Sequence, residues 1–86
     1  MVTGTPKEPL SPATIEFGAR VRSLRQEHGW SQERLADECG LHWTYVGQVE
    51  RGRRNLTLHN IVRLAAALGA DPSVLVTGLE APPGKE

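Results

Sequence analysis

The chain has 86 residues, the size of one small domain with little core to spare, so two folded domains are excluded. Ten Lys and Arg residues balance ten Asp and Glu residues, and a net charge of zero excludes attraction of the whole molecule to nucleic acid as a polycation. Its one cysteine, Cys39, cannot form an internal disulfide, and we find no signal-peptide pattern and no apolar run of membrane-spanning length. We therefore expect a soluble protein of the reducing cytoplasm.

Both ends of the chain are expected to be flexible extensions. Residues 1–10 carry two prolines and few apolar side chains, and residues 80–86 read EAPPGKE. The folded domain is therefore predicted over residues 11–79.

The first predicted helix starts at Ser11-Pro12, which has the form of an N-cap followed by a proline at the first helical position. Apolar side chains then recur at spacings of four and three residues. The pattern stops at His28-Gly29, where we expect the helix to end.

Two further helices are predicted on either side of a very short connection. Ser31 caps the second helix, and Gly40 ends it by taking the left-handed backbone conformation. The third helix starts near His42 and is closed in the same way by Gly52.

The last part of the domain is also predicted to be helical. Thr57 caps a fourth helix that ends at Gly69, and Asp71-Pro72 repeats the cap-and-proline signal for a short fifth helix. No segment of useful length alternates between apolar and polar residues as a half-buried strand does. The predicted fold class is therefore all-α, with five helices.

The connection between the second and third helices has the pattern of a helix-turn-helix. Ala36 lies four residues before Gly40, and Val46 lies six residues after it. A small side chain lets the two helices cross closely, the glycine permits a tight turn, and apolar side chains attach the pair to the core. The joint pattern is far more specific than any one of these residues.

The segment WSQERLADECGLHWTYVGQVERGRRNLTLHNIVRLAAALG resembles the Cro and cI repressor-like (XRE-type) helix-turn-helix family. The resemblance extends from Phe17 to about Val76, and the stretch TYVGQVERGRRNLT is most similar to the controller proteins of restriction-modification systems. It implies a compact five-helix, lambda-repressor-like domain that regulates transcription. Such domains bind double-stranded DNA, usually as a homodimer on a palindromic operator.

The third helix, starting near His42, is the predicted recognition helix, because the N-terminal part of such a helix faces base edges in the major groove. Its predicted base contacts are Trp43, Thr44, Gly47 and Gln48. Gln48 can hydrogen-bond adenine, and Thr44 can bond a base or touch a thymine methyl group. Trp43 either presses on thymine methyls or sugar, or packs against the second helix, and Gly47 either admits close backbone approach or avoids a clash. His42 lacks the hydroxyl that is usual at a cap, so we expect a frayed helix start.

Six residues are the predicted phosphate contacts: Gln32, Tyr45, Arg51, Arg53, Arg54 and Asn55. Arginine forks suit phosphate oxygens, and Gln32 stands at a helix N-terminus, which attracts anions. The alternatives are a solvated arginine cluster, an Arg51 that only complements the end of the recognition helix, and a Tyr45 ring that packs beside the fourth helix.

Glu50 needs a partner, because a carboxylate at the base of a DNA-facing helix would repel phosphate if it were exposed. The family resemblance implies that Glu50 forms a structural ion pair with Arg25.

A homodimer is expected to form through apolar side chains at the end of the domain: Val74, Leu75, Val76 and Leu79. The alternative is that these side chains seal the core of the monomer, and a small domain can use some for each purpose.

Metal binding and catalysis are not expected. Cys39 and His42 could form part of a zinc site, but no second pair accompanies them at ligand spacing. Cys39 falls on the apolar face of the second helix, where a buried thiol is ordinary packing. We find no nucleophile motif or phosphate-binding glycine loop, and so we expect no enzyme, cofactor or small-molecule ligand.

A protein-interaction module is the main alternative function, since this fold also occurs in antitoxins and adaptors that reuse the DNA-facing surface. The two functions differ in a simple observable. Specific DNA binding weakens steeply with salt because counterions are released, whereas a hydrophobic protein interface lacks this dependence.

Overall fold

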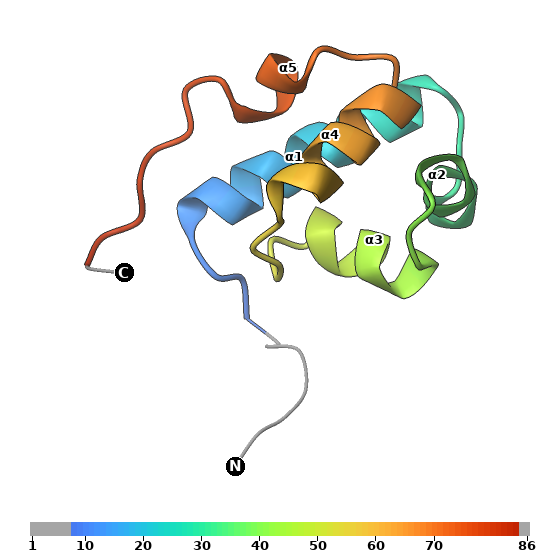
Figure 1. The fold of residues 1–86 in the computed structure, drawn as a ribbon. Coiled ribbons are helices and arrows are strands. Elements are labelled where there is room, and N and C mark those ends of the chain that lie inside the picture. Colours follow the sequence, from blue (N-terminus) through green and yellow to red (C-terminus); the bar gives the residue numbers. More distant parts are fainter. Residues whose placement is uncertain (1–7, 85–86) are drawn as a thin grey trace.

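The computed structural model describes residues 8–84, and all of the regular structure in that range is helical (Figure 1). The prediction of an all-α fold with five helices is confirmed for this range. The helices are α1 (Pro12–Glu27), α2 (Gln32–Cys39), α3 (Trp43–Glu50), α4 (Leu58–Ala67) and α5 (Pro72–Val76).

Helices α1 and α4 occupy the middle of the molecule, and the other helices pack around them (Figure 1). α2 and α3 contact each other, and they also pack on α4 and α1 respectively. α5 packs on both α1 and α4. The helix-turn-helix therefore lies apart from α5, on the other side of α1 and α4 (Figure 1).

Polar caps fix where the helices begin. The Ser11 hydroxyl accepts a hydrogen bond from the Thr14 N–H at 3.1 Å, and the Thr14 hydroxyl accepts one from the Ser11 N–H at 3.1 Å. Ser31 and Thr57 cap α2 and α4 through their own side-chain oxygens, and Asp71 caps α5. The predicted caps are thus present, and they satisfy backbone N–H groups that have no partner inside the helix.

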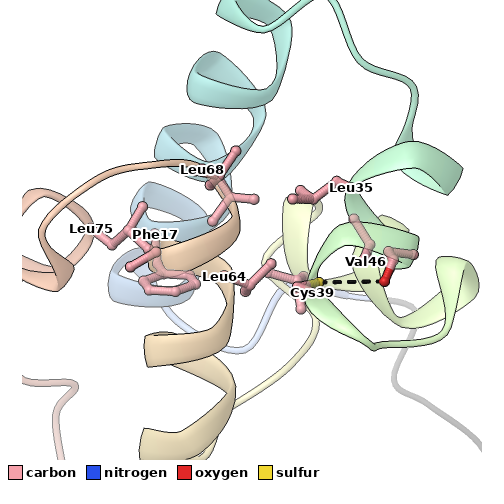
Figure 2. Packing of buried hydrophobic residues seen from close by; sticks show 11 residues of the cluster. Phe17, Leu35, Cys39, Val46, Leu64, Leu68 and Leu75 are labelled. Carbon is pink, nitrogen blue, oxygen red and sulfur yellow. Dashed lines mark hydrogen bonds between the residues drawn. The ribbon is translucent and has the colours of Figure 1, made fainter.

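One apolar cluster, to which every helix contributes, holds the fold together (Figure 2). Leu64 of α4 is fully buried and lies between Phe17 of α1 and Cys39 of α2. Burying one leucine side chain stabilises a fold by about 1.5–3 kcal/mol relative to leaving it exposed. Leu75 is the anchor of the short helix α5 and has no exposed surface.

Two glycines let α1 and the end of α3 approach each other closely. A Cβ atom on Gly18 would lie 2.2 Å from the carbonyl oxygen of Val49. Gly52 has a φ of +74°, and a Cβ atom there would lie 2.9 Å from the Cα atom of Ile15. No side chain fits at either contact, so α3 is positioned by backbone packing against α1.

The connection between α2 and α3 has the predicted helix-turn-helix geometry. Ala36 is buried, and Gly40 has the left-handed φ of +72°. The Leu41 N–H donates to the Ala36 carbonyl at 3.0 Å, which closes the turn at the end of α2.

The folded domain, which was predicted to start at Ser11, is preceded by a residue that bonds to it. The Leu10 N–H donates to the Gly52 carbonyl at 2.9 Å, so the ordered part begins at least one residue before Ser11. Residues 1–7 and 85–86 of the two expected extensions lie outside the described range. The division into two tails and one domain otherwise stays a prediction.

Candidate nucleic-acid interface

The outer side of α3 carries two of the predicted base-contacting side chains in an exposed position. Trp43 has 52% of its surface exposed, and Thr44 is also exposed. The indole ring of Trp43 stacks loosely on the ring of His42, with 6.1 Å between centroids. Trp43 is therefore presented at the surface, which favours the first of its two predicted roles over burial against α2.

The start of α3 is capped by an imidazole in place of a hydroxyl. The Nδ1 atom of His42 accepts a hydrogen bond from the Thr44 N–H at 3.1 Å. In neutral histidine one ring nitrogen is an acceptor, so it can satisfy a free N–H of the first turn. The expectation of a frayed start is therefore wrong, and Trp43 and Thr44 stand on an ordered first turn.

Gly47 makes room for two neighbouring side chains. A Cβ atom on Gly47 would lie 3.3 Å from Oε1 of Gln32 and 3.3 Å from Nη1 of Arg51. Gly47 itself is buried. Of its two predicted roles, this geometry favours the avoidance of a clash, and the groups that lie over it are the Gln32 amide and the Arg51 guanidinium.

The predicted ion pair between Arg25 and Glu50 is present and nearly dry. Nε and Nη2 of Arg25 donate to the two carboxylate oxygens of Glu50 at 2.6 and 3.0 Å, and only 3% of the Glu50 side chain is exposed. The hydrogen bond to Glu50 raises the pKa of Arg25 above its usual value, although burial acts in the opposite direction. Paired in this way, the Glu50 carboxylate faces the interior instead of the surface of α3.

Two further hydrogen bonds connect this ion pair to α2 and to the turn before it. Nη1 of Arg25 donates to the Trp30 carbonyl at 2.8 Å, and Nε2 of Gln32 donates to Oε1 of Glu50 at 3.0 Å. Gln32, a predicted phosphate contact, thus donates one of its two amide N–H groups to Glu50. Its position at the first turn of α2 was predicted, but its hydrogen bond to Glu50 and its place beside Gly47 were not.

Tyr45 lies between α3 and α4. Its hydroxyl oxygen accepts a hydrogen bond from Nδ2 of Asn60 at 3.1 Å, and its ring is half-buried. The Tyr45 ring thus packs beside α4, which is the alternative to a purely DNA-facing tyrosine given above. The hydroxyl hydrogen is still available to donate to an acceptor outside the protein.

The arginines after α3 differ from one another in their surroundings. Arg51 is exposed and reaches back over Gly47, whereas Arg53 is half-buried with an Nε atom that has no hydrogen-bond partner among residues 8–84. Arg54 donates from Nε to Oε1 of Gln48 at 2.8 Å, and its Cζ atom lies over the Tyr45 ring at 5.1 Å from the centroid. Asn55 is exposed. The segment is therefore no uniform solvated cluster.

Two contacts were not predicted from the sequence: the hydrogen bond from Asn60 to Tyr45 and the hydrogen bond from Arg54 to Gln48. Both contacts depend on how the loop after α3 folds back toward α4. Gln48 and Arg54 are six residues apart across a helix end, and no periodic pattern connects such positions. The N-cap at Thr57 gives a partial signal, because it places Asn60 in the first turn of α4.

The four predicted dimer contacts divide into two groups. Val74 and Val76 are exposed on α5, with 48% and 40% of their surfaces accessible. Leu75 has no exposed surface and Leu79 packs partly against the core. Assigning Leu75 to an interface is therefore wrong, because its side chain faces inward on a helix whose neighbouring positions face outward.

A second exposed apolar stripe lies on α4 and was not predicted. Leu58 and Val62 are four residues apart on this helix, which places them on one face, and 72% of the surface of Leu58 is exposed. The stripe is thus a second exposed apolar patch, on the helix against which α5 packs.

Cys39 is a free, buried thiol whose Sγ donates to the Ala36 carbonyl at 3.7 Å (Figure 2). Burial raises the pKa of this thiol. Cys39 is therefore packed in the core, as its place on the apolar face of α2 predicts.

In the part of the chain that the structure describes, no three His, Cys, Asp or Glu side chains come together as a metal site would require. None of the helices between residues 8 and 84 has the length and apolar character needed to cross a membrane.

Comparison with known proteins gives consistent matches. The family model described as Helix-turn-helix matches residues 21–75. The control protein C.BamHI of Bacillus amyloliquefaciens is 48% identical over 61 residues, which cover 70% of this chain and 75% of that protein.

Two solved structures show the same fold. The restriction-modification controller protein C.AhdI from Aeromonas hydrophila is 52% identical, with a TM-score of 0.71 over 72% of this chain and 94% of that one. The P22 c2 repressor in complex with a synthetic operator is 27% identical, with a TM-score of 0.68 over the same shares of the two chains.

We predict that breaking the ion pair from one side destabilises the fold strongly. Glu50→Gln or Arg25→Met should lower the free energy of unfolding by about 3–5 kcal/mol, because an unpaired charge or polar group stays in a dry site. The double variant should lose less than the sum of the two single variants. Urea denaturation followed by circular dichroism measures these values.

The matched control is the exposed pair between Arg34 and Glu38, which has the same donor atom and a distance of 2.9 Å. Arg34→Ala should cost at most about 1 kcal/mol. Equal losses at the two pairs, or strictly additive losses at Arg25 and Glu50, would contradict the role of the buried pair.

Proposed function

The chain belongs to the helix-turn-helix family, and from this premise we propose that it is a sequence-specific DNA-binding transcriptional regulator. The observation that carries the proposal is the outer side of α3, where exposed Trp43 and Thr44 stand beside the Gln48 amide, with guanidinium groups at the end of the helix. The P22 c2 repressor, whose structure contains an operator, shares this fold.

In this proposal, α3 enters the major groove of double-stranded DNA. Thr44 and Gln48 meet base edges, and Trp43 covers a thymine methyl or a deoxyribose. The capped first turn supports this placement, since it holds the leading side chains in one orientation.

Phosphate contacts are proposed for groups that surround α3. The candidates are the guanidinium groups of Arg51 and Arg53, the Asn55 amide and the Tyr45 hydroxyl. The positive charge of Arg51 and Arg53 is local, since the net charge of the chain is zero and the neighbouring Glu50 is paired with Arg25. We therefore expect DNA to be attracted to this side of the protein and not to the molecule as a whole.

We further propose a homodimer whose interface contains Val74 and Val76 of α5, extended by the exposed stripe on α4. Two-fold symmetry would place the two copies of α3 about 34 Å apart, on successive major-groove faces of a palindrome. A regulator of this kind acts on DNA in the cytoplasm and needs no cofactor or small-molecule ligand.

We predict different losses of DNA binding for two substitutions near α3. Gln48→Ala should remove discrimination at particular base pairs, by about 1–3 kcal/mol. Arg53→Ala should weaken binding to operator and random DNA alike and should reduce the slope of log K against log salt by about 1. Fluorescence anisotropy titrations at several salt concentrations measure both effects.

Operator binding that survives both substitutions would show that α3 is docked incorrectly in this proposal. Binding of a protein partner with little salt dependence, and no DNA binding, would favour an interaction module instead.

We predict that Val74→Asp converts the dimer to a monomer, because it places a carboxylate in an apolar interface. Thr44→Asp, which adds the same charge on α3, should leave self-association unchanged while weakening DNA binding. Sedimentation equilibrium of the two variants measures the oligomeric state. A Val74→Asp protein that stays dimeric would place the interface elsewhere.

A further inference from the structure

Arg54 belongs to a continuous set of side-chain contacts that ends at the base-facing Gln48. Asn60 of α4 donates to the Tyr45 hydroxyl at 3.1 Å. The Arg54 guanidinium lies over the Tyr45 ring at 5.1 Å, and its Nε donates to Oε1 of Gln48 at 2.8 Å. The Gln48 side chain is thereby attached to a second helix, α4, through two intermediate residues.

The chemistry of the hydrogen bond determines which end of the Gln48 amide faces Arg54. A guanidinium can only donate, so it selects the amide oxygen. The amide nitrogen of Gln48 has no partner among residues 8–84, and its two N–H groups are free to donate. Without Arg54 the amide can rotate by half a turn and exchange its acceptor and donor ends.

Arg54 is itself held in place. A flat guanidinium stacks on an aromatic ring, and its fork loses less side-chain freedom than a lysine would in making the same bond. The Arg54 side chain is half-buried, whereas Arg51 in the same segment is exposed. Arg54 therefore differs from an exposed arginine whose guanidinium has no contact within the protein.

We propose that Arg54 is a positioning residue for base recognition, which holds the Gln48 amide with its N–H groups directed outward. This inference rests on the proposed function. Held in this way, Gln48 offers hydrogen-bond donors to acceptor atoms in the major groove, such as O6 and N7 of guanine or O4 of thymine. Arg54 then contributes sequence discrimination in addition to any contact with phosphate.

The first test uses the free protein and compares Arg54→Met with Arg53→Met. Methionine keeps much of the length of the arginine side chain and can lie on the Tyr45 ring, but it has no N–H donor. Relaxation of the side-chain amide of Gln48, measured by NMR spectroscopy, should show a rigid group in the wild-type protein and in Arg53→Met. The same group should become mobile in Arg54→Met. An equally rigid amide in Arg54→Met would overturn the positioning role.

The second test measures binding to the preferred operator and to variants at the base pair that Gln48→Ala identifies. Arg54→Met should reduce discrimination at that base pair about tenfold, the value of one good base contact. Arg54→Met combined with Gln48→Ala should discriminate no less than Gln48→Ala alone. Arg53→Met should weaken all of these DNA sequences by the same factor.

Two results of the binding test would overturn the inference. One is an Arg54→Met protein that weakens every sequence equally, which is the behaviour of a phosphate contact. The other is a double variant whose loss of discrimination is the sum of the two single losses. A wild-type protein that prefers no sequence would instead refute the proposed function, and the NMR comparison separates that outcome from a failure of Arg54 to position Gln48.

Discussion

The buried pair between Arg25 and Glu50 connects three parts of the chain that must be aligned before α3 can present its outer face. Arg25 lies near the end of α1, Glu50 is the last residue of α3, and their bonds to the Trp30 carbonyl and the Gln32 amide include the start of α2. A charge in so dry a place is tolerated only when its partner is fully engaged. The pair therefore penalises any arrangement in which the helix-turn-helix is displaced from α1.

Backbone packing reinforces the same alignment. Gly18 and Gly52 allow α1 to touch the end of α3 with no side chain between them, and the Thr14 hydroxyl donates to the Gly52 carbonyl at 2.7 Å. Glu50 is paired with Arg25 inside the domain, and none of the ion pairs among residues 8–84 involves the arginines that follow Glu50. The pairing of Glu50 with Arg25 thus fixes α3 and leaves the positive charge of the following arginines beside it. For this reason we propose that a protein of zero net charge binds DNA on one side.

Much of the fold was predictable from local signals, because each helix start carries a cap that acts within one turn, as at Ser11 and Thr57. The pairing of Arg25 with Glu50 came from the family resemblance, since nothing local connects positions 25 residues apart. The bond from Arg54 to Gln48 depends on how a loop returns to α4, so it was visible only in three dimensions. Leu75 was misplaced because a five-residue helix gives too short a pattern to separate its inner from its outer side.

Base reading by α3 is tested most directly by selecting bound sequences from a random pool of double-stranded DNA with the purified protein at near-physiological salt. We expect enrichment of a two-fold-symmetric motif, with half-sites spaced for two copies of α3 about 34 Å apart. A folded protein that enriches no motif would contradict the proposal that α3 reads base sequence.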